Sequence, residues 1–196
     1  MAFAQLFRVA AVMAGFGRPW GFCGGWALDL FLNQETRGHV DVDVAVLRRD
    51  QVALRRHLVE REWWLEIADG SKLTPWEDGR IIQPPLHGIW ASNQLHDPTF
   101  IEFLLSEGNE TTFQFAGDPS ITLPLDEAFV RSEAGLPVLA PQIVLLHQVG
   151  DAATPPPPTA ALAALGEAQR KWLRRGIERL YPGHVWLEQE LNSVSQ

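Results

Sequence analysis

Hydrophobic and polar positions alternate in ways that predict a strand-rich first part of the chain and a helical end. Phe3, Leu6, Phe7, Ala10 and Met13 recur at helical spacing, which predicts a docked helix within the first sixteen residues. Further helices are predicted over residues 26–33 and from residue 51 to about 62, where Asp50 can cap the N-terminus. Turn residues separate short apolar runs that predict strands at residues 63–67, 72–76, 88–91 and 99–105.

The C-terminal part of the chain has a different pattern. Pro155 to Pro158 predicts a stiff, extended connector, and Thr159 to Leu180 predicts a helical pair or one broken helix. We therefore predict an α/β (α+β) fold, with a short mixed sheet and flanking helices in residues 1–138 and a small helical portion in residues 139–196.

Composition and charge narrow the class of protein. The chain of 196 residues is 46% hydrophobic and 20% charged, as expected for one globular unit or two small lobes. A net charge of −8, with Lys72 and Lys171 as the only lysines, argues against a nucleic-acid partner. No apolar run reaches the roughly 18 residues of a membrane span. A single cysteine, Cys23, excludes an internal disulfide, so we expect a cytoplasmic protein.

The segment from Val40 to Val46 carries the first candidate chemistry. Alternate residues of a strand share a face, so Asp41 and Asp43 project together and the valines between them point the other way. Carboxylates held roughly 6 to 7 Å apart along a strand repel each other, and a cation offsets that repulsion. Mg²⁺, which prefers oxygen ligands, suits this pair. A solvated strand edge is the simpler alternative.

Gly24 and Gly25 stand where the helix predicted at 26–33 would begin. Because glycines have no Cβ, a phosphate could approach the backbone N–H groups of the helix N-terminus there. A tight turn without a ligand is the alternative. Arg37 and His39 lie between these glycines and the aspartates, and this combination favours the functional reading.

Glu102 is the only acid within the apolar run Phe100 to Leu105. A buried carboxylate without a partner is costly, so a third metal-site carboxylate would explain its position. The alternative is that Glu102 faces solvent or pairs with an arginine.

These residues resemble a known family. Gly-Gly-Trp-Ala-Leu-Asp at 24–29 and Thr-Arg-Gly-His-Val-Asp-Val-Asp at 36–43 are similar to the small bacterial antibiotic nucleotidyltransferases of the polymerase-β-like superfamily, which include aminoglycoside and lincosamide adenylyltransferases. The likeness is strong over residues 20–47. It continues more weakly through residues 100–107 and Leu139 to Leu146.

The resemblance implies a fold, a reaction and a set of roles. The fold would be the polymerase-β-like nucleotidyltransferase fold, and the reaction would move AMP from ATP onto a hydroxyl of a small molecule. Asp41, Asp43 and Glu102 would hold Mg²⁺ and catalyse the transfer, with Glu102 beside the aspartates on a neighbouring strand. Gly24, Gly25, Arg37 and His39 would bind the nucleotide. The acidic chain suits a cationic acceptor such as an aminoglycoside, and a homodimer stays open.

Several alternatives remain at this point. Asp29 could contact substrate or orient Arg37 or His39, and Arg37 could meet a phosphate or brace the anionic strand. The resemblance also implies a lysine near His147, where this chain has none, which leaves the phosphate charge to Arg131 or to a partner subunit. A catalytically impaired or regulatory module that binds or modifies a protein partner is thus the second hypothesis. A glycosyltransferase is a third, although it leaves the Gly-Gly helix start unexplained.

Overall fold

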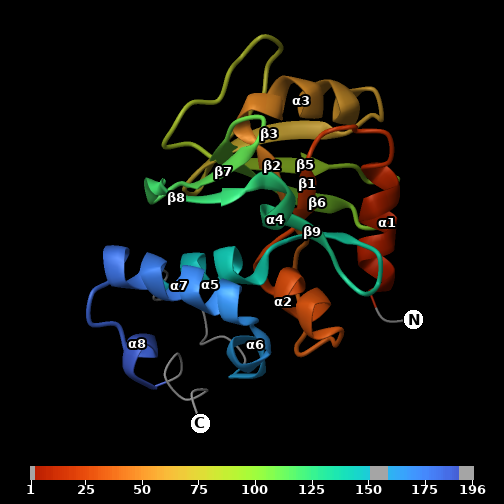
Figure 1. The fold of residues 1–196 in the computed structure, drawn as a ribbon. Coiled ribbons are helices and arrows are strands. Elements are labelled where there is room, and N and C mark those ends of the chain that lie inside the picture. The colour runs from red at the N-terminus through yellow and green to blue at the C-terminus, as the bar shows by residue number, and fades with distance from the viewer. Residues whose placement is uncertain (1–2, 151–158, 190–196) are drawn as a thin grey trace.

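A computed structural model describes residues 3–150 and 159–189 of this chain (Figure 1). The predicted connector at 155–158 lies outside these described residues. The helices are α1 (Ala4–Val12), α2 (Gly24–Leu32), α3 (Gln51–Val59), α4 (Leu125–Ala128), α5 (Pro141–Val149), α6 (Thr159–Ala164), α7 (Glu167–Leu180) and α8 (Trp186–Gln189), with a 3₁₀ turn at Arg48–Asp50.

Ten strands form one mixed sheet within the described residues. They are β1 (Trp20–Phe22), β2 (Asp43–Leu47), β3 (Trp64–Asp69), β4 (Lys72–Pro75), β5 (Gly88–Ser92), β6 (Phe100–Gly108), β7 (Thr112–Phe115), β8 (Asp118–Pro124), β9 (Phe129–Arg131) and β10 (Pro137–Leu139). The order is β4-β3-β5-β6-β2-β1-β10-β9, and the β7–β8 hairpin branches from β6. Only β2 with β6 and β1 with β10 pair in parallel, so the predicted mixed α+β fold is confirmed.

The two faces of the sheet differ in burial. Along β3, β5 and β6, every second side chain is buried, and these side chains form one apolar face with Leu54 and Leu58 of α3. Side chains on the other face of the same strands are half-buried or, in the case of Trp64, exposed. β2 is buried on both faces except at Asp43, its first residue. The sheet thus holds a packed core on one side and an accessible surface on the other.

The predicted helices are present at the expected positions, but some of their apolar side chains are exposed instead of buried. Leu6 and Met13 are buried as expected, whereas Phe7 is 43% exposed because it lies on the outer side of α1. Val52 and Val59 of α3 are also exposed, although Leu54 and Leu58 are buried. Asp50 precedes α3 without a side-chain capping hydrogen bond, so the predicted cap is wrong.

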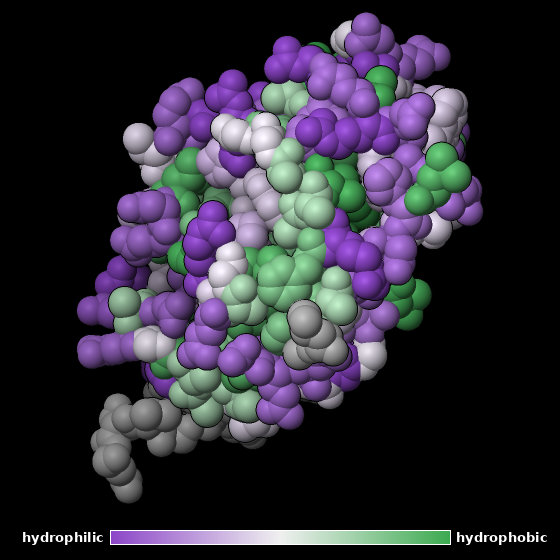
Figure 2. Space-filling model, turned by 90° about the vertical axis from the view of Figure 1, so that its right-hand side faces the viewer, coloured by the Kyte–Doolittle hydropathy of each residue, from purple (hydrophilic) through white to green (hydrophobic). Residues whose placement is uncertain are grey.

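The face seen in Figure 2 is the one that lies on the right-hand side of Figure 1, where α1 is drawn. Hydrophobic residues gather in its centre and polar residues surround them (Figure 2). Among the described residues, no helix combines the length and apolar character needed to cross a bilayer.

Helices α5, α6 and α7 lie together with α2 on the lower side of the molecule (Figure 1). The predicted helical pair at 159–180 is confirmed as α6 and α7, separated at Leu165 and Gly166. A division into residues 1–138 and 139–196 stays a prediction. The predicted boundary falls at the last residue of β10, Leu139, and α5 begins two residues later at Pro141.

Candidate active site

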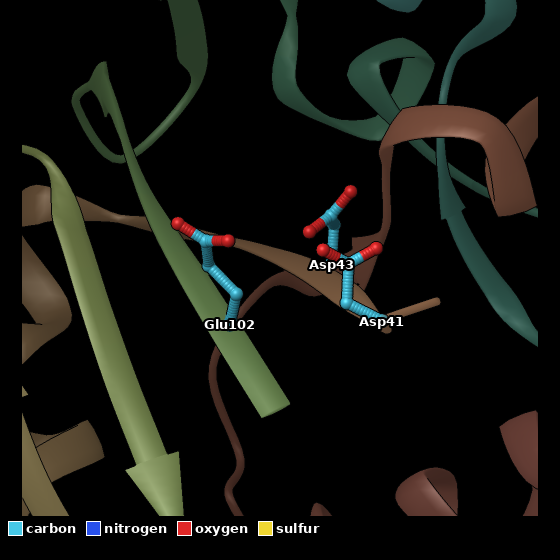
Figure 3. A group of neighbouring side chains, drawn as sticks. All are labelled: Asp41, Asp43 and Glu102. Carbon is cyan, nitrogen blue, oxygen red and sulfur yellow. The ribbon is translucent and has the colours of Figure 1, made fainter. Parts of the chain in front are cut away.

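Three carboxylates meet at the start of β2 (Figure 3). β2 and β6 are neighbouring parallel strands, and Asp43 is the register partner of Glu102. Asp41 lies just before β2, and the Glu102 backbone N–H donates to the carbonyl of Val42 at 3.0 Å. One ligand oxygen from each of Asp41, Asp43 and Glu102 lies within 4.8 Å of the others. The predicted convergence of these side chains is therefore present.

The charges of the three groups oppose one another. Burial is the main cause that raises the pKa of Asp43 to about 7, and Asp41 and Glu102 add to the effect. Burial also raises the pKa of Glu102, while the Trp90 indole N–H and His87 act in the opposite direction. A divalent cation would remove this repulsion. The all-oxygen donor set, partly accessible to solvent, fits Mg²⁺.

Gly24 has a purpose that the sequence did not reveal. Its φ of 61° is in the left-handed region that favours glycine, and an added Cβ would collide with Asp43 Oδ2. Since β1 pairs with β2 and the Cys23 N–H donates to the Asp43 carbonyl at 2.9 Å, the helix start is fixed directly beside the carboxylate. Gly24 therefore makes room for Asp43. Its predicted contact with phosphate stays a prediction.

Gly25 is enclosed by the two basic residues predicted to work with it. An added Cβ would lie 2.7 Å from Nη2 of Arg37 and 2.8 Å from Nδ1 of His39. Arg37 is exposed, so its guanidinium lies at the N-terminal end of α2 and is open to solvent. Arg37 is thus the group here that can meet an anion. The Cβ side of Gly25 is already filled by side chains.

His39 is a buried member of a polar network. Its Nε2 lies 2.7 Å from Oδ2 of Asp29, and the two side chains are 4% and 1% exposed. Thr36 donates to the other Asp29 oxygen. Asp29 therefore pairs with His39, which was one of the two basic residues that it could orient. Direct nucleotide binding by His39 stays a prediction, and its burial makes a positioning role simpler.

Trp26 completes this network, and the sequence reasoning gave it no role. Its indole ring stacks on His39 with centroids 4.2 Å apart, and its Nε1 donates to the Asp41 backbone carbonyl at 2.9 Å. The loop from Thr36 to Asp41 is thereby tied to α2 at both ends. A tryptophan directly after two glycines, within the recognised motif, was the available signal.

On α5, His147 stands where the resemblance implied a lysine. It stacks on Phe115 with centroids 4.4 Å apart, and burial, with a smaller contribution from His87, lowers its pKa to about 4. His147 is therefore neutral at pH 7 and supplies no phosphate charge. Arg131 donates to the Gly135 carbonyl at 2.7 Å and lines a separate hollow of about 910 Å³ with Trp20 and Arg18, which none of the predicted site residues lines.

The mixed sheet, in which β2 and β6 pair in parallel, brings Asp43 beside Glu102. The first part of the chain also matches a family in sequence: the model of aminoglycoside-2''-adenylyltransferases matches residues 5–71. The resemblance inferred from residues 20–47 is thereby confirmed. No curated protein matches the chain in sequence.

Solved structures share the fold over nearly the whole chain. The solution structure of the antibiotic-resistance factor ANT(2'')-Ia has a TM-score of 0.57 and 18% identity, covering 90% of this chain and 91% of its own. A crystal structure of ANT(2'')-Ia with adenylyl-2''-tobramycin gives 0.57 and 16%, covering 89% and 95%. The lincomycin-bound lincosamide adenylyltransferase LnuA gives 0.52 and 12%, covering 90% and 96%.

Proposed function

We propose that this chain is a Mg²⁺-dependent nucleotidyltransferase that moves AMP from ATP onto a hydroxyl of an antibiotic-like small molecule. The observation that carries the proposal is the meeting of Asp41, Asp43 and Glu102 within 4.8 Å beside the start of α2. The aminoglycoside-2''-adenylyltransferase match, which ends at residue 71, includes both aspartates and supports the same reaction.

The residues divide the work in this proposal. Asp41, Asp43 and Glu102 would hold Mg²⁺, which supplies positive charge to offset the charge that develops on the transferred phosphoryl group. Glu102, on the partly accessible face of the sheet, is placed to accept the proton of the acceptor hydroxyl or to share the cation. Arg37 would contact the phosphates from the N-terminal end of α2, where backbone N–H groups also favour an anion.

Asp29, His39 and Trp26 would act without touching substrate. They fix the loop from Thr36 to Asp41 against α2, so Asp41 and Arg37 are held in place before the nucleotide arrives. Preorganised groups of this kind supply most of the rate enhancement in phosphoryl transfer.

One observation favours the second hypothesis, an impaired or regulatory module. His147 is neutral and buried, so α5 brings no cation from this position. Weak nucleotide affinity would follow if no other residue replaced that charge. A module of this kind would bind a nucleotide or a protein partner without efficient turnover.

Pyrophosphate release separates the two hypotheses. We expect release that requires ATP, Mg²⁺ and an acceptor hydroxyl together, tested with tobramycin and lincomycin as acceptors. Thermal shifts with each nucleoside triphosphate, with and without Mg²⁺, provide a binding readout that does not depend on turnover. A shift without pyrophosphate release would favour the module, and the absence of both would contradict nucleotide chemistry altogether. Cytoplasmic location and a homodimer remain predictions.

A further inference from the structure

The outer face of α1 is apolar. Gln5 and Arg8 are the only polar residues of this helix. Phe7 and Ala11 on its outer side, and Ala14 in the turn that follows it, are exposed. A helix on the surface of a globular protein normally directs polar side chains toward water. The outer face of α1 is therefore an unusual apolar surface that is open to solvent.

The exposed residues have the spacing of a helix-packing row. Phe7, Ala11 and Ala14 are separated by four and three positions, like the a and d residues of a coiled coil, so they lie along one line of the surface. Phe7 is large, and the two alanines are small. A second helix can approach closely over the alanines and place a large side chain there. We call this row the α1 seam.

One flank of the α1 seam is formed by the loop between β5 and β6. Nη2 of Arg8 lies 3.2 Å from Oδ2 of Asp97, which holds this loop beside α1, and both side chains remain accessible. Leu95, two residues before Asp97, is 88% exposed. This flank therefore has one charge of each sign and an exposed leucine.

The other flank of the α1 seam opens into the hollow of about 910 Å³. Ala10 and Met13 line the hollow on the side of α1, and Phe129 and Val130 line it from β9. Ala10 and Arg8 lie on opposite sides of the seam, because successive residues of a helix are turned by about 100°. Figure 2, which views the molecule from the side where α1 is drawn in Figure 1, shows hydrophobic residues at the centre and polar residues around them.

The charges around α1 favour a second copy of this chain as the occupant. A helix that lies on a lipid surface is rich in Lys and Arg, whereas α1 has only Arg8, which pairs with Asp97. Contact about a two-fold axis brings the same flank of both copies together, so the two ion pairs can exchange partners. Chains of net charge −8 repel each other, and this repulsion is smallest at a flank whose own charges cancel.

We infer that two copies of this chain associate through the α1 seam, with the two helices antiparallel about a two-fold axis. Phe7 packs on the partner's Ala11, so each large side chain meets a small one. A stable interface buries about 800 Å² on each partner, more than one row of a nine-residue helix provides. The contact therefore includes Leu95 and the rim of the hollow. This inference is independent of the proposed reaction.

Sedimentation velocity of the full chain, at concentrations up to the millimolar range, tests the association. The mass should rise with concentration from 21.9 kDa toward twice that value. Phe7→Glu should raise the dissociation constant about a hundredfold or more, because it places a carboxylate in an apolar contact and two like charges near each other. Phe7 is partly exposed, and thermal unfolding shows whether the variant still folds.

Val185→Glu is the matched control. Val185 is also exposed, and it directly precedes α8, which Figure 1 draws on the side of the molecule away from α1. This variant adds the same charge and should keep the dissociation constant of the unaltered chain. Equal weakening by the two substitutions would mean that only the net charge matters, and would overturn the α1 seam.

Chemical cross-linking tests the orientation of the two copies. Ala11→Cys should be joined to its partner by a short bismaleimide and give a band of twice the mass on a denaturing gel. The unaltered chain should give none, because its one cysteine, Cys23, is buried. Val185→Cys should give no such band, and adding Phe7→Glu to Ala11→Cys should remove it.

The outcomes decide between a second copy and other occupants. A chain that stays at 21.9 kDa at every concentration overturns the inference, and so does a dimer that survives Phe7→Glu. A monomer that binds vesicles containing phosphatidylglycerol, and loses this binding in Phe7→Glu, assigns the surface to lipid instead. None of these measurements uses turnover, so their failure leaves the nucleotidyltransferase proposal in place, and failure to release pyrophosphate leaves the α1 seam in place.

Discussion

Helices α2 and α5 pack against each other, yet they bring very different groups to the molecule. The N-terminal end of α2 is surrounded by Arg37, His39 and the carboxylate of Asp43. The C-terminal turn of α5 brings His147, which is buried against Phe115 and uncharged. Helix α2 is part of a polar network, whereas α5 carries a buried, neutral histidine at the position where a lysine was expected.

The difference indicates where selection of the nucleotide would act. The contacts of Asp29 with His39 and of Trp26 with Asp41 lie on the α2 side, so the loop that carries Asp41 is held in place there. On the α5 side, burial of a neutral histidine favours stability and contributes nothing to phosphate affinity. Changes on the α2 side should therefore affect chemistry most, and changes on the α5 side should affect stability.

The largest effect should come from Asp43→Asn. Loss of one metal carboxylate should lower kcat/KM for Mg²⁺-dependent pyrophosphate release by about 1,000-fold or more. The metal-free variant should keep its Tm or gain a few degrees. The pKa of Asp43 is raised to about 7 in the folded state, so its ionisation reduces stability as the pH rises from about 3.8 through 7.

Asp69→Asn is the control, because Asp69 is exposed at the end of β3 and its loss makes the same chemical change away from the site. It should alter neither activity nor Tm. An active Asp43→Asn enzyme would contradict the metal assignment.

His39→Ala should give the next largest effect, a loss of about 3 kcal/mol in the free energy of unfolding. The Asp29 carboxylate would remain buried with Thr36 as its side-chain partner, and a buried carboxylate that loses a hydrogen-bond partner costs free energy. Urea denaturation at pH 7.5 measures the effect. His39→Gln, which can still donate to Asp29, should recover part of the loss; equal losses in the two variants would mean that the hydrogen bond is unimportant.

Gly24→Ala should reduce both stability and activity, the former by about 2 kcal/mol. The left-handed backbone and the collision with Asp43 both contribute. Gly70→Ala separates the two causes, because Gly70 has a φ of 57° and open space around it. It should cost about 1 kcal/mol and leave turnover unchanged. Similar turnover in both variants would show that Gly24 does not position Asp43.

Much of the site could be predicted because it rests on local periodicity. Asp41 and Asp43 alternate with valines, and Glu102 interrupts an apolar strand, so each residue's face follows from the sequence. The pairing of Asp29 with His39 left two alternatives open, because a sequence cannot tell which of two nearby bases turns toward a helical acid. The closeness of Gly24 to Asp43 escapes sequence analysis for a related reason, because this approach runs from the first residue of α2 to the first residue of β2.

The sheet was larger than the sequence suggested, and the missed strands are instructive. Phe113 and Phe115 alternate on β7, and Ile121 and Leu123 alternate on β8, so the hairpin had a signal that was not used. β9 and β10 have three residues each and pair with each other, and only the pairing of β10 with the distant strand β1 joins them to the sheet, which no local pattern reports. Phe7 is exposed although it recurs at helical spacing, because an apolar residue at that spacing can also lie on the border of the apolar stripe.

His147→Gln should give the smallest effect, and the effect should be confined to acid. The pKa of His147 is about 4 in the folded state and near 6.5 when unfolded, so the unfolded chain takes up the proton first. Above pH 6.5 this histidine is neutral in both states and does not change the free energy of unfolding. As the pH falls from 6.5 toward 4, the unfolded chain is protonated first and the free energy of unfolding decreases. At pH 5.5 the loss should be about 1 kcal/mol, and the His147→Gln variant, which has no proton to take up at this position, should not suffer it.

The measurement is the change in unfolding free energy between pH 7.5 and pH 5.5, compared within each protein so that any lost stacking on Phe115 cancels. His96→Gln, which removes an exposed histidine, should retain the pH dependence of the parent. If His147→Gln keeps the full acid dependence, then the buried ring of α5 is not the group that titrates. In that case the pKa of His147 would not be lowered by folding. The contrast between a neutral α5 and a charged α2 at pH 7 would then not rest on His147.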